Sequence, residues 1–192
     1  MDVRLDGKVA VVSGGSRGIG RAVAARLADA GAHVMLTSRK EAGLAEAASS
    51  LAGKDGAVAW FAAHVAEPGA AEACMAETVE RFGAVDILVN NAGTNPYYGP
   101  LVDLDLPRAD KTVQVNQEAV LTWTQAAWRA SMADRGGAVL NVASIGGMSV
   151  EPGIGWYNVT KAAVAHLTRQ LAYELAPGVR VNALAPGLVR TH

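Results

Sequence analysis

Two polar residues stand four positions apart in a helix-length segment near the end of the sequence, Tyr157 and Lys161. In a helix this spacing places both side chains on one face. An ammonium beside a phenol favours the phenolate and lowers the phenol pKa from about 10, so such a tyrosine can give or take a proton at a carbonyl oxygen. Ser144 follows a predicted strand, and its hydroxyl could hold that carbonyl. The alternative is a surface Tyr–Lys pair without a chemical role.

A glycine-rich turn lies near the N-terminus, at positions 13–20. It follows a short apolar segment and precedes a helix-length one, and its glycines include positions 14, 18 and 20. Glycine allows a tight backbone turn and lets a pyrophosphate approach the amides at a helix N-terminus. The spacing differs from G-x-G-x-x-G, and the alternative is a turn needed only for packing. Its place between a strand and a helix favours dinucleotide binding.

The segment after the second predicted strand, 37–40, indicates which dinucleotide is bound. A free ribose 2′-hydroxyl favours an Asp or Glu there, whereas this chain has Ser38, Arg39 and Lys40. Arg17 lies in the glycine-rich turn. Two guanidinium groups near one ribose suit a 2′-phosphate, because arginine pairs with phosphate through two hydrogen bonds. We therefore expect NADP(H); the alternative is that Arg39 and Lys40 only cap a solvated strand end.

Asparagines mark two further positions. The motif 90–93 (Asn-Asn-Ala-Gly) follows the fourth predicted strand, and its short polar side chains could tie that strand to the cofactor loop. Asn116 stands among valines in a long helical segment, where a buried amide needs a hydrogen-bond partner. A structural water or a link to Lys161 would satisfy it.

The elements that position these residues alternate regularly along the chain. The predicted strands are 8–13, 33–37, 57–63, 85–89, 138–143 and 179–184, and the predicted helices are 18–31, 41–51, 68–82, 106–132 and 155–175. The first strand is apolar on both faces, which is typical of a parallel strand covered by helices. The alternation predicts a single doubly wound parallel sheet, a Rossmann fold, with helices on both faces. Its strands' carboxyl ends would share one crevice.

The composition narrows the class of protein. The chain has 192 residues, 51% of them apolar, which is enough for one domain with a sizeable core. Seventeen basic and 18 acidic side chains give a net charge of −1, so the basic footprint of a nucleic-acid-binding protein is missing. One cysteine, Cys74, allows no internal disulfide, and four scattered histidines indicate no metal site. With no leader-like N-terminus and no membrane-length apolar run, we expect a cytoplasmic protein without membrane partners.

The order of these motifs resembles the short-chain dehydrogenase/reductase family. The resemblance rests on the glycine-rich turn, the 90–93 motif, Asn116, Ser144, the Tyr157–Lys161 pair and the Pro-Gly at 186–187, and it covers essentially the whole chain. It implies that Tyr157 is the general acid/base and that Ser144 orients the carbonyl. It also implies that Lys161 binds the nicotinamide ribose and lowers the Tyr157 pKa, and that Asn116 holds the water of a proton relay.

The same resemblance implies the cofactor contacts. Most family members have an Asp after the third strand that contacts adenine; here His64 replaces it, and a neutral imidazole nitrogen could still accept a bond from the adenine amino group. The implied contacts are Gly14, Ser16, Arg17, Gly18, Ile19, Gly20, Ser38, Arg39, His64, Val65, Asn91, Ala92, Gly93, Tyr157, Lys161, Val189 and Thr191.

Within the family, the segments 37–40, 63–65, 91–99 and 184–188 look like those of NADP-dependent retinol/carbonyl reductases, and they are also similar to actinobacterial 3-oxoacyl-carrier-protein reductases. The implied reaction is hydride transfer between NADP(H) and a small ketone or aldehyde, which interconverts it with an alcohol. A 3-oxoacyl thioester substrate, on carrier protein or coenzyme A, is the alternative. The family's helix pairing implies a homo-oligomer, a tetramer or a dimer.

Family members usually continue beyond position 192 with a substrate lid, a further helix and a last strand. We expect residues 1–192 to form a dinucleotide-binding domain that carries the catalytic residues and lacks those elements. A second alternative follows from this expectation. The chain would be a non-catalytic nucleotide-binding module if it truly ends at His192.

Overall fold

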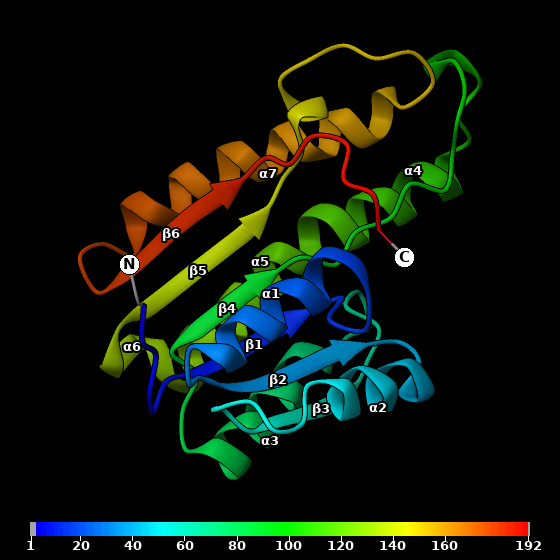
Figure 1. Cartoon of the computed structure of the whole chain (residues 1–192). Coiled ribbons are helices and arrows are strands. Elements are labelled where there is room, and N and C mark those ends of the chain that lie inside the picture. Colours follow the sequence, from blue (N-terminus) through cyan, green and yellow to red (C-terminus); the bar gives the residue numbers. More distant parts are fainter. Residues whose placement is uncertain (1–2, 192) are drawn as a thin grey trace.

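A computed structural model, which describes residues 3–191, contains one sheet of six parallel strands (Figure 1). The strands are β1 (Val9–Ser13), β2 (His33–Ser38), β3 (Val58–Ala62), β4 (Ile87–Asn90), β5 (Gly137–Val142) and β6 (Val179–Leu184). Their order in the sheet is β3-β2-β1-β4-β5-β6. The order therefore reverses between β1 and β4, and in open sheets of this kind ligands bind at the carboxyl ends of the strands near such a reversal.

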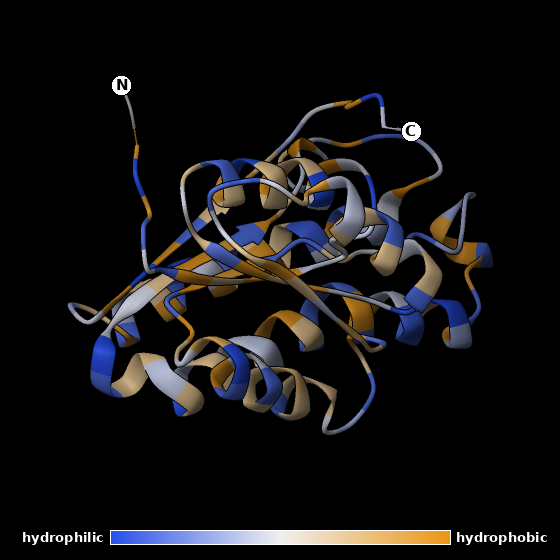
Figure 2. Ribbon diagram, turned by 60° about the horizontal axis from the view of Figure 1, so that its bottom comes forward, coloured by the Kyte–Doolittle hydropathy of each residue, from blue (hydrophilic) through white to orange (hydrophobic). Residues whose placement is uncertain are grey.

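Helices cover both faces of the sheet. One apolar core lies between the sheet and α1 (Gly18–Asp29) and α2 (Glu41–Ser50). The other lies between the sheet and α3 (Ala70–Phe82), α5 (Ala119–Ala127) and α7 (Gly155–Glu174). Figure 2 shows the hydrophobic strands between these two layers of helices. All five residues of β1 are buried, as its double-sided apolar sequence predicts, and the predicted doubly wound sheet is confirmed.

The long helical segment predicted at 106–132 is confirmed, but it is not uniform. It consists of α4 (Leu106–Val113), η2 (Gln114–Glu118), α5 and η3 (Trp128–Met132), and α6 (Ala133–Arg135) follows it. Both η2 and η3 are turns of π-helix. Turns of π-helix inside a regular helix are frequent at functional sites, and Asn116 lies within such a turn, η2. Two short 3-10 turns, η1 (Leu101–Asp103) and η4 (Ile145–Gly147), flank the same end of the molecule.

The start of α3 differs from the sequence prediction. Pro68 was expected to open this helix, whereas α3 begins at Ala70. The residue between them, Gly69, has φ +78°, a left-handed backbone conformation that cannot belong to an α-helix. The left-handed backbone of Gly69 therefore sets the start of α3, and Pro68 lies in the preceding loop.

Residues 3–191 lack three features that are often tied to function: a membrane-spanning helix, a metal-ligand cluster and a reactive thiol. No helix there is long and apolar enough to cross a membrane. No group of three or more His, Cys, Asp or Glu side chains in that range could hold a metal ion. Cys74 is a buried free thiol, and burial raises its pKa to about 12, so it is not a reactive thiolate at neutral pH.

Gly20 allows α1 to pack closely on the glycine-rich turn, and this contact makes a prediction about stability. A Cβ at position 20 would overlap the carbonyl oxygen of Gly14, whereas a Cβ at position 43 in α2 would meet only the Cβ of Ser16, at 3.7 Å. We expect Gly20→Ala to lower the free energy of unfolding by about 1–3 kcal/mol because the backbone must shift. Gly43→Ala should raise it by about 0.5–1 kcal/mol, since alanine is the better helix former. Urea unfolding of both variants tests this, and equal effects would contradict it.

Candidate functional site

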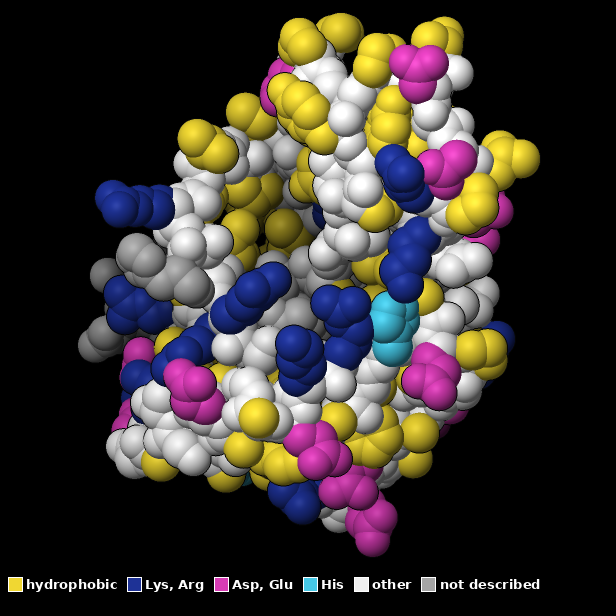
Figure 3. All heavy atoms as spheres, turned by 90° about the vertical axis from the view of Figure 1, so that its right-hand side faces the viewer, with side chains coloured by type: hydrophobic (Ala, Val, Ile, Leu, Met, Phe, Trp, Pro, Cys, Tyr) yellow, Lys and Arg dark blue, Asp and Glu magenta, His cyan; other side chains and the backbone are white. Residues whose placement is uncertain are grey.

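The predicted site residues lie at or after the carboxyl ends of all six strands, on the first turns of α7 and, for Asn116, in η2. Figure 3 views the molecule from this side and shows a hollow with hydrophobic walls, with Lys and Arg side chains and a histidine gathered below it. The chain thus brings together groups that lie more than 140 positions apart in the sequence, from Gly14 to Lys161.

The glycine-rich turn has the backbone that its composition predicts. Gly14 and Gly18 have φ +64° and +55°, a region that favours glycine. Helix α1 starts directly after Arg17, whose side chain does not cap it. The N-cap side chain therefore accepts no hydrogen bond from the first backbone N–H groups of α1, which point into the turn. Backbone N–H groups in this arrangement bind phosphate at a helix N-terminus.

Asn91 and Ser13 fasten the loop after β4 to the glycine-rich turn. The side-chain amide of Asn91 donates to the carbonyl oxygens of Ser13 (2.9 Å) and Gly14 (3.2 Å). The hydroxyl of Ser13 accepts from the backbone N–H groups of Asn91 (3.0 Å) and Ala92 (3.1 Å). The predicted tie between the 90–93 motif and the cofactor loop is present. Sequence reasoning missed Ser13, although a hydroxyl at the end of an apolar strand was a usable signal.

Asn116 is fully buried in η2, and its partners differ from those expected. Its Oδ1 accepts from the backbone N–H of Thr94 (2.8 Å), and its Nδ2 donates to the Thr94 carbonyl and to Thr160 Oγ1, both at 3.0 Å. Of the two partners expected for Asn116, a water or Lys161, the direct hydrogen bond to Lys161 is not formed among the described residues. The two groups nevertheless meet at Gly93, where a Cβ would lie 3.6 Å from both Asn116 Oδ1 and Lys161 Nζ.

Lys161 is buried, with only 4% of its surface exposed. Its Nζ donates to the carbonyl oxygen of Val142, the last residue of β5, at 2.7 Å. Burial lowers the pKa of Lys161 from 10.5 to about 8, because desolvation penalises the charged form. The ammonium lies 5.7 Å from the ring centroid of Tyr157, so the two side chains share one face of α7 as predicted.

Tyr157 is half-buried, and its pKa differs from the sequence prediction. Burial raises this pKa above 10, and a hydrogen bond with Ser144 opposes the shift. The lysine was expected to lower the tyrosine pKa, but desolvation of the phenol outweighs other influences here. Ser144 Oγ also accepts from the backbone N–H of Gly146 at 3.1 Å, which fixes its hydroxyl at the start of η4.

The far end of the crevice carries the predicted cationic residues. Arg17 and Arg39 are exposed, Ser38 is half-buried, and neither arginine forms an ion pair within residues 3–191. His64 is half-buried after β3, and its Nδ1 accepts from the backbone N–H of Ala66 at 3.2 Å. The next residue, Val65, is buried, and its carbonyl accepts from the indole of Trp123 at 3.0 Å.

The C-terminal segment returns to the glycine-rich turn. A Cβ on Gly18 would lie 3.1 Å from the Cγ2 atom of Thr191, so the predicted contact residue Thr191 lies beside the turn. Val189 is half-exposed nearby, and the whole segment runs across the carboxyl edge of the sheet (Figure 1). Its start is held by the N–H of Ile145, which donates to the Pro186 carbonyl at 3.1 Å.

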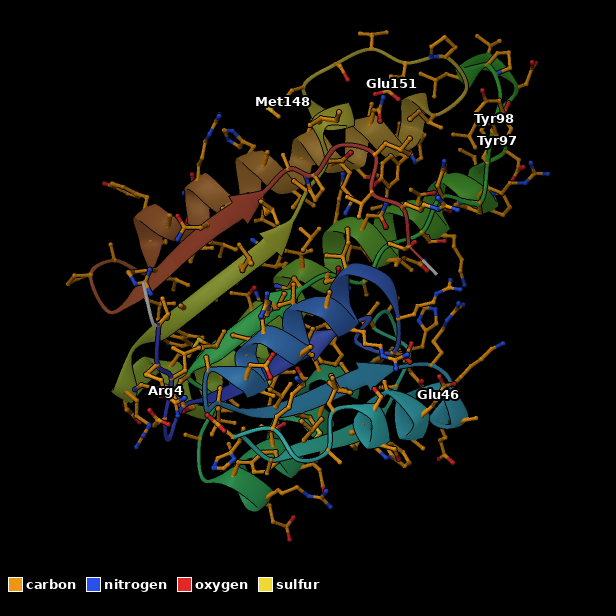
Figure 4. All side chains as sticks on the ribbon, in the orientation of Figure 1. Arg4, Glu46, Tyr97, Tyr98, Met148 and Glu151 are labelled. Atoms are coloured by element: carbon orange, nitrogen blue, oxygen red, sulfur yellow. The ribbon has the colours of Figure 1, made fainter. Side chains whose placement is uncertain are left out.

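Apolar and aromatic side chains form the outer rim of the hollow. The loop after β4 packs on the loop before α7, because the N–H of Gly99 donates to the Gly153 carbonyl at 2.9 Å. Figure 4 shows Tyr97 and Tyr98 together on the first loop and Met148 on the second. Tyr98 and Met148 are 78% and 73% exposed, which gives the rim a hydrophobic surface.

A chain of buried amides and hydroxyls joins the strands under the site. Asn90 Nδ2 donates to Asn141 Oδ1 (2.9 Å) across β4 and β5, and Asn141 Nδ2 donates to Thr168 Oγ1 (2.9 Å) on α7. Asn90 Nδ2 also lies 3.2 Å from Thr124 Oγ1 on α5. Sequence reasoning missed Asn141 and Thr168, since nothing in the sequence pairs their positions.

Comparison with known proteins agrees with this fold and site. The family described as short chain dehydrogenase matches residues 8–192. The human protein named "Dehydrogenase/reductase SDR family member 4" is 42% identical over 188 residues, which are 97% of this chain and 68% of that protein. The chain therefore belongs to the short-chain dehydrogenase/reductase family of oxidoreductases.

Two solved structures are similar to the whole arrangement. A short chain dehydrogenase from Burkholderia cenocepacia in complex with NADP matches with a TM-score of 0.91 and 38% identity, over 98% of this chain and 77% of the other. An NAD⁺-bound xylitol dehydrogenase matches with a TM-score of 0.91 and 30% identity, over 95% and 70%. The family therefore uses nicotinamide cofactors, and its members differ in which one they hold.

The buried Lys161 predicts an unusual pH dependence of stability. Its pKa is about 8 in the folded chain and 10.5 when exposed, so the unfolded chain binds more protons between these values. The free energy of unfolding should therefore gain up to about 1.4 kcal/mol per pH unit from this group as the pH rises from 8 to 10.5. Below pH 8 Lys161 is charged in both states, so the full cost of burying its charge lowers the free energy of unfolding.

Lys161→Met removes this contribution, and all other titrating groups remain. Urea unfolding from pH 7 to 10.5 should show a stability difference, wild type minus variant, that increases with pH above about 8. A constant difference over that range would contradict the depressed pKa.

Proposed function

We propose that this chain is an NADP(H)-dependent oxidoreductase that interconverts a ketone or aldehyde and an alcohol, with Tyr157 as general acid/base. The observation that carries the proposal is the convergence of Tyr157, Ser144 and Lys161. Lys161 and Asn116 both lie beside Gly93, in the loop that Asn91 fastens to the glycine-rich turn. These groups come from α7, the end of β5 and a π-turn, and they meet only because the strands share a carboxyl edge.

The residues present fit a dinucleotide. The glycine-rich turn supplies left-handed backbone at positions 14 and 18 and leaves the first amides of α1 without a side-chain cap, which suits a pyrophosphate. Lys161 Nζ and Gly93 lie together, so the ammonium can hydrogen-bond to the hydroxyls of a nicotinamide ribose at this point. The proposed contacts remain those of the sequence analysis, from Gly14 to Thr191.

NADP(H), when bound, supplies or accepts the hydride. Tyr157 moves the matching proton at its Oη: because burial raises its pKa, the phenol carries its proton at neutral pH and can donate it to a carbonyl oxygen. Ser144 is placed to hold that oxygen by its hydroxyl. The ammonium of Lys161 stabilises the phenolate that remains after proton transfer. Asn116 fixes the Thr94 backbone beside Gly93, and we assign it the support of the proton relay.

An apolar carbonyl compound is the best-supported substrate class. Exposed side chains at the rim include the apolar or aromatic Tyr98, Met148 and Ile145. A 3-oxoacyl thioester, on carrier protein or coenzyme A, is the alternative substrate.

We propose a homo-oligomeric assembly on similar grounds. Leu121 and Trp128, on α5 and η3, are 36% and 42% exposed, and apolar side chains of this size on one helical segment suit a subunit contact. A tetramer or a dimer, and a cytoplasmic location, stay predictions.

Tyr157→Phe tests the proton-transfer role. NADPH oxidation with a panel of aromatic diketones, retinal and acetoacetyl thioesters should show a kcat reduced by about 10²–10⁴-fold, because the general acid is lost. NADPH affinity should stay within about twofold, since the ring remains. The control is Tyr173→Phe, on the same helix but 84% exposed, which should leave turnover unchanged.

Full turnover by Tyr157→Phe would contradict the role of the phenol. NADPH binding by the wild type without turnover of any carbonyl in the panel would favour the non-catalytic alternative.

Arg39→Gln tests the preference for NADP(H). Loss of a charged partner for the 2′-phosphate should weaken NADPH binding by about tenfold and leave NADH binding within about twofold. Fluorescence titration measures both, and Arg169→Gln, at an exposed position on α7, is the matched control. An equal loss for both cofactors would mean that Arg39 does not read the phosphate.

A further inference from the structure

The short turn η4 lies directly on α7 (Figure 1), and two glycines make this close approach possible. A Cβ on Gly147 would lie 2.7 Å from the backbone nitrogen of Ala162. A Cβ on Gly146 would overlap the side-chain amide of Asn158. At these two positions η4 therefore places bare backbone against α7. The place of Ser144, which is the N-cap of η4, depends on this contact.

Asn158 is the polar side chain in the contact between η4 and α7. It is only 7% exposed, and within residues 3–191 neither its Oδ1 nor its Nδ2 has a hydrogen-bond partner. A buried amide without a partner costs free energy, and native proteins keep few of them. The three heavy atoms nearest to a Cβ on Gly146 would all belong to this amide. In glycine a Cα hydrogen points in that direction, so Oδ1 faces a C–H group, which is a weak donor.

A closed path of contacts joins Asn158 to the hydroxyl groups of the site. The N–H of Gly146 donates to Ser144 Oγ at 3.1 Å. Ser144 is hydrogen-bonded to Tyr157, and Tyr157 precedes Asn158 in the chain. Gly146 is thus held from two sides, by the Asn158 amide and by the Ser144 hydroxyl. A shift of Gly146 relative to α7 would carry the Ser144 hydroxyl with it.

We propose that Asn158 is a positioning residue, which sets the distance between Ser144 Oγ and Tyr157 Oη because its amide is the surface on which Gly146 rests. The proposal rests on the proposed function, in which these two hydroxyls hold and protonate the carbonyl oxygen. It also explains why an amide without a partner is kept here. An oxygen atom is smaller than a methyl group, so an apolar side chain of the same shape would lift η4 from α7.

Two substitutions disturb this contact in opposite directions. Asn158→Ala removes the surface under Gly146, whereas Gly146→Ala adds a methyl group that overlaps the amide and must lift η4. The φ angle of Gly146 is not positive, so alanine adds no backbone strain there. We expect each variant to lower the kcat of NADPH oxidation by about 10–100-fold, since a misplacement of about 1 Å near the reacting atoms has an effect of this size. The Kd of NADPH should stay within about twofold, because the glycine-rich turn is untouched.

The double variant gives the sharpest result. Asn158→Ala frees the room that the amide takes, so the methyl group of Gly146→Ala can fill it and η4 can return to its place. The kcat of the double variant should exceed that of either single variant by at least about tenfold, whereas the effects of independent sites would add. Val159→Ala, the next position on α7 and 47% exposed, is the control. It should leave kcat unchanged by itself and restore nothing in combination with Gly146→Ala.

Ser144→Ala tests whether Asn158 acts through the serine. In this background Asn158→Ala should change kcat by less than about twofold, because the group that it positions is gone. Circular dichroism shows whether each variant is folded. If Asn158→Ala does not fold, Gly146→Ala is compared in the same two backgrounds with the same expected result.

Three results would overturn the proposal: an Asn158→Ala variant with a kcat within about twofold of the wild type, a double variant no faster than Gly146→Ala, or an equal loss with and without Ser144. In each case the wild type still binds NADPH and reduces a carbonyl compound, so the proposed function would stand. A wild type that does neither would instead refute the proposed function, and this inference with it.

Discussion

The ammonium of Lys161 lies inside the protein against the carbonyl oxygen of Val142, and the geometry of the site follows from that contact. A charge buried to 4% exposure is costly unless it is hydrogen-bonded, so α7 must approach β5 at its carboxyl end. One turn earlier on α7, Tyr157 then faces the crevice, and two residues after Val142, Ser144 starts η4 beside it. The same ammonium lies next to Gly93, where a Cβ would be 3.6 Å from it.

The buried polar chain beneath the site supports this arrangement. Asn90 and Asn141 stand opposite each other in the register of β4 and β5, and Asn141 reaches Thr168 on α7. Fully satisfied amides in a core fix the relative positions of the elements that carry them, because any shift would leave a buried group unpaired. Helix α7 is thus held to the sheet at two points, by Lys161 near its start and by Thr168 two turns later. A site that acts on a carbonyl needs such rigid support.

The sequence alone predicts those elements whose signals lie within a few neighbouring residues. Strand β6 begins and ends where its apolar alternation predicts, and the i, i+4 spacing correctly placed Tyr157 and Lys161 on one face of α7. The glycine-rich turn was also predictable, because only glycine adopts the left-handed backbone there without strain.

What could not be predicted depends on contacts between distant segments. The partners of Asn116 are the backbone of Thr94 and the hydroxyl of Thr160, which a π-turn, the loop after β4 and helix α7 bring together. The raised pKa of Tyr157 follows from burial, a property of the assembled layers and not of the lysine spacing. The tautomer of His64 depends on one backbone N–H two residues later, which is visible only once the loop is folded.

The central claim is that these groups direct a hydride to a carbonyl carbon while Tyr157 delivers the proton. The most direct test incubates the chain with an aromatic diketone and NADPH that carries two deuterons at C4 of the nicotinamide, and measures the mass of the alcohol product. One deuteron on the carbinol carbon of every product molecule is the predicted result. Bound NADPH without labelled alcohol, for any carbonyl tested, would contradict the account.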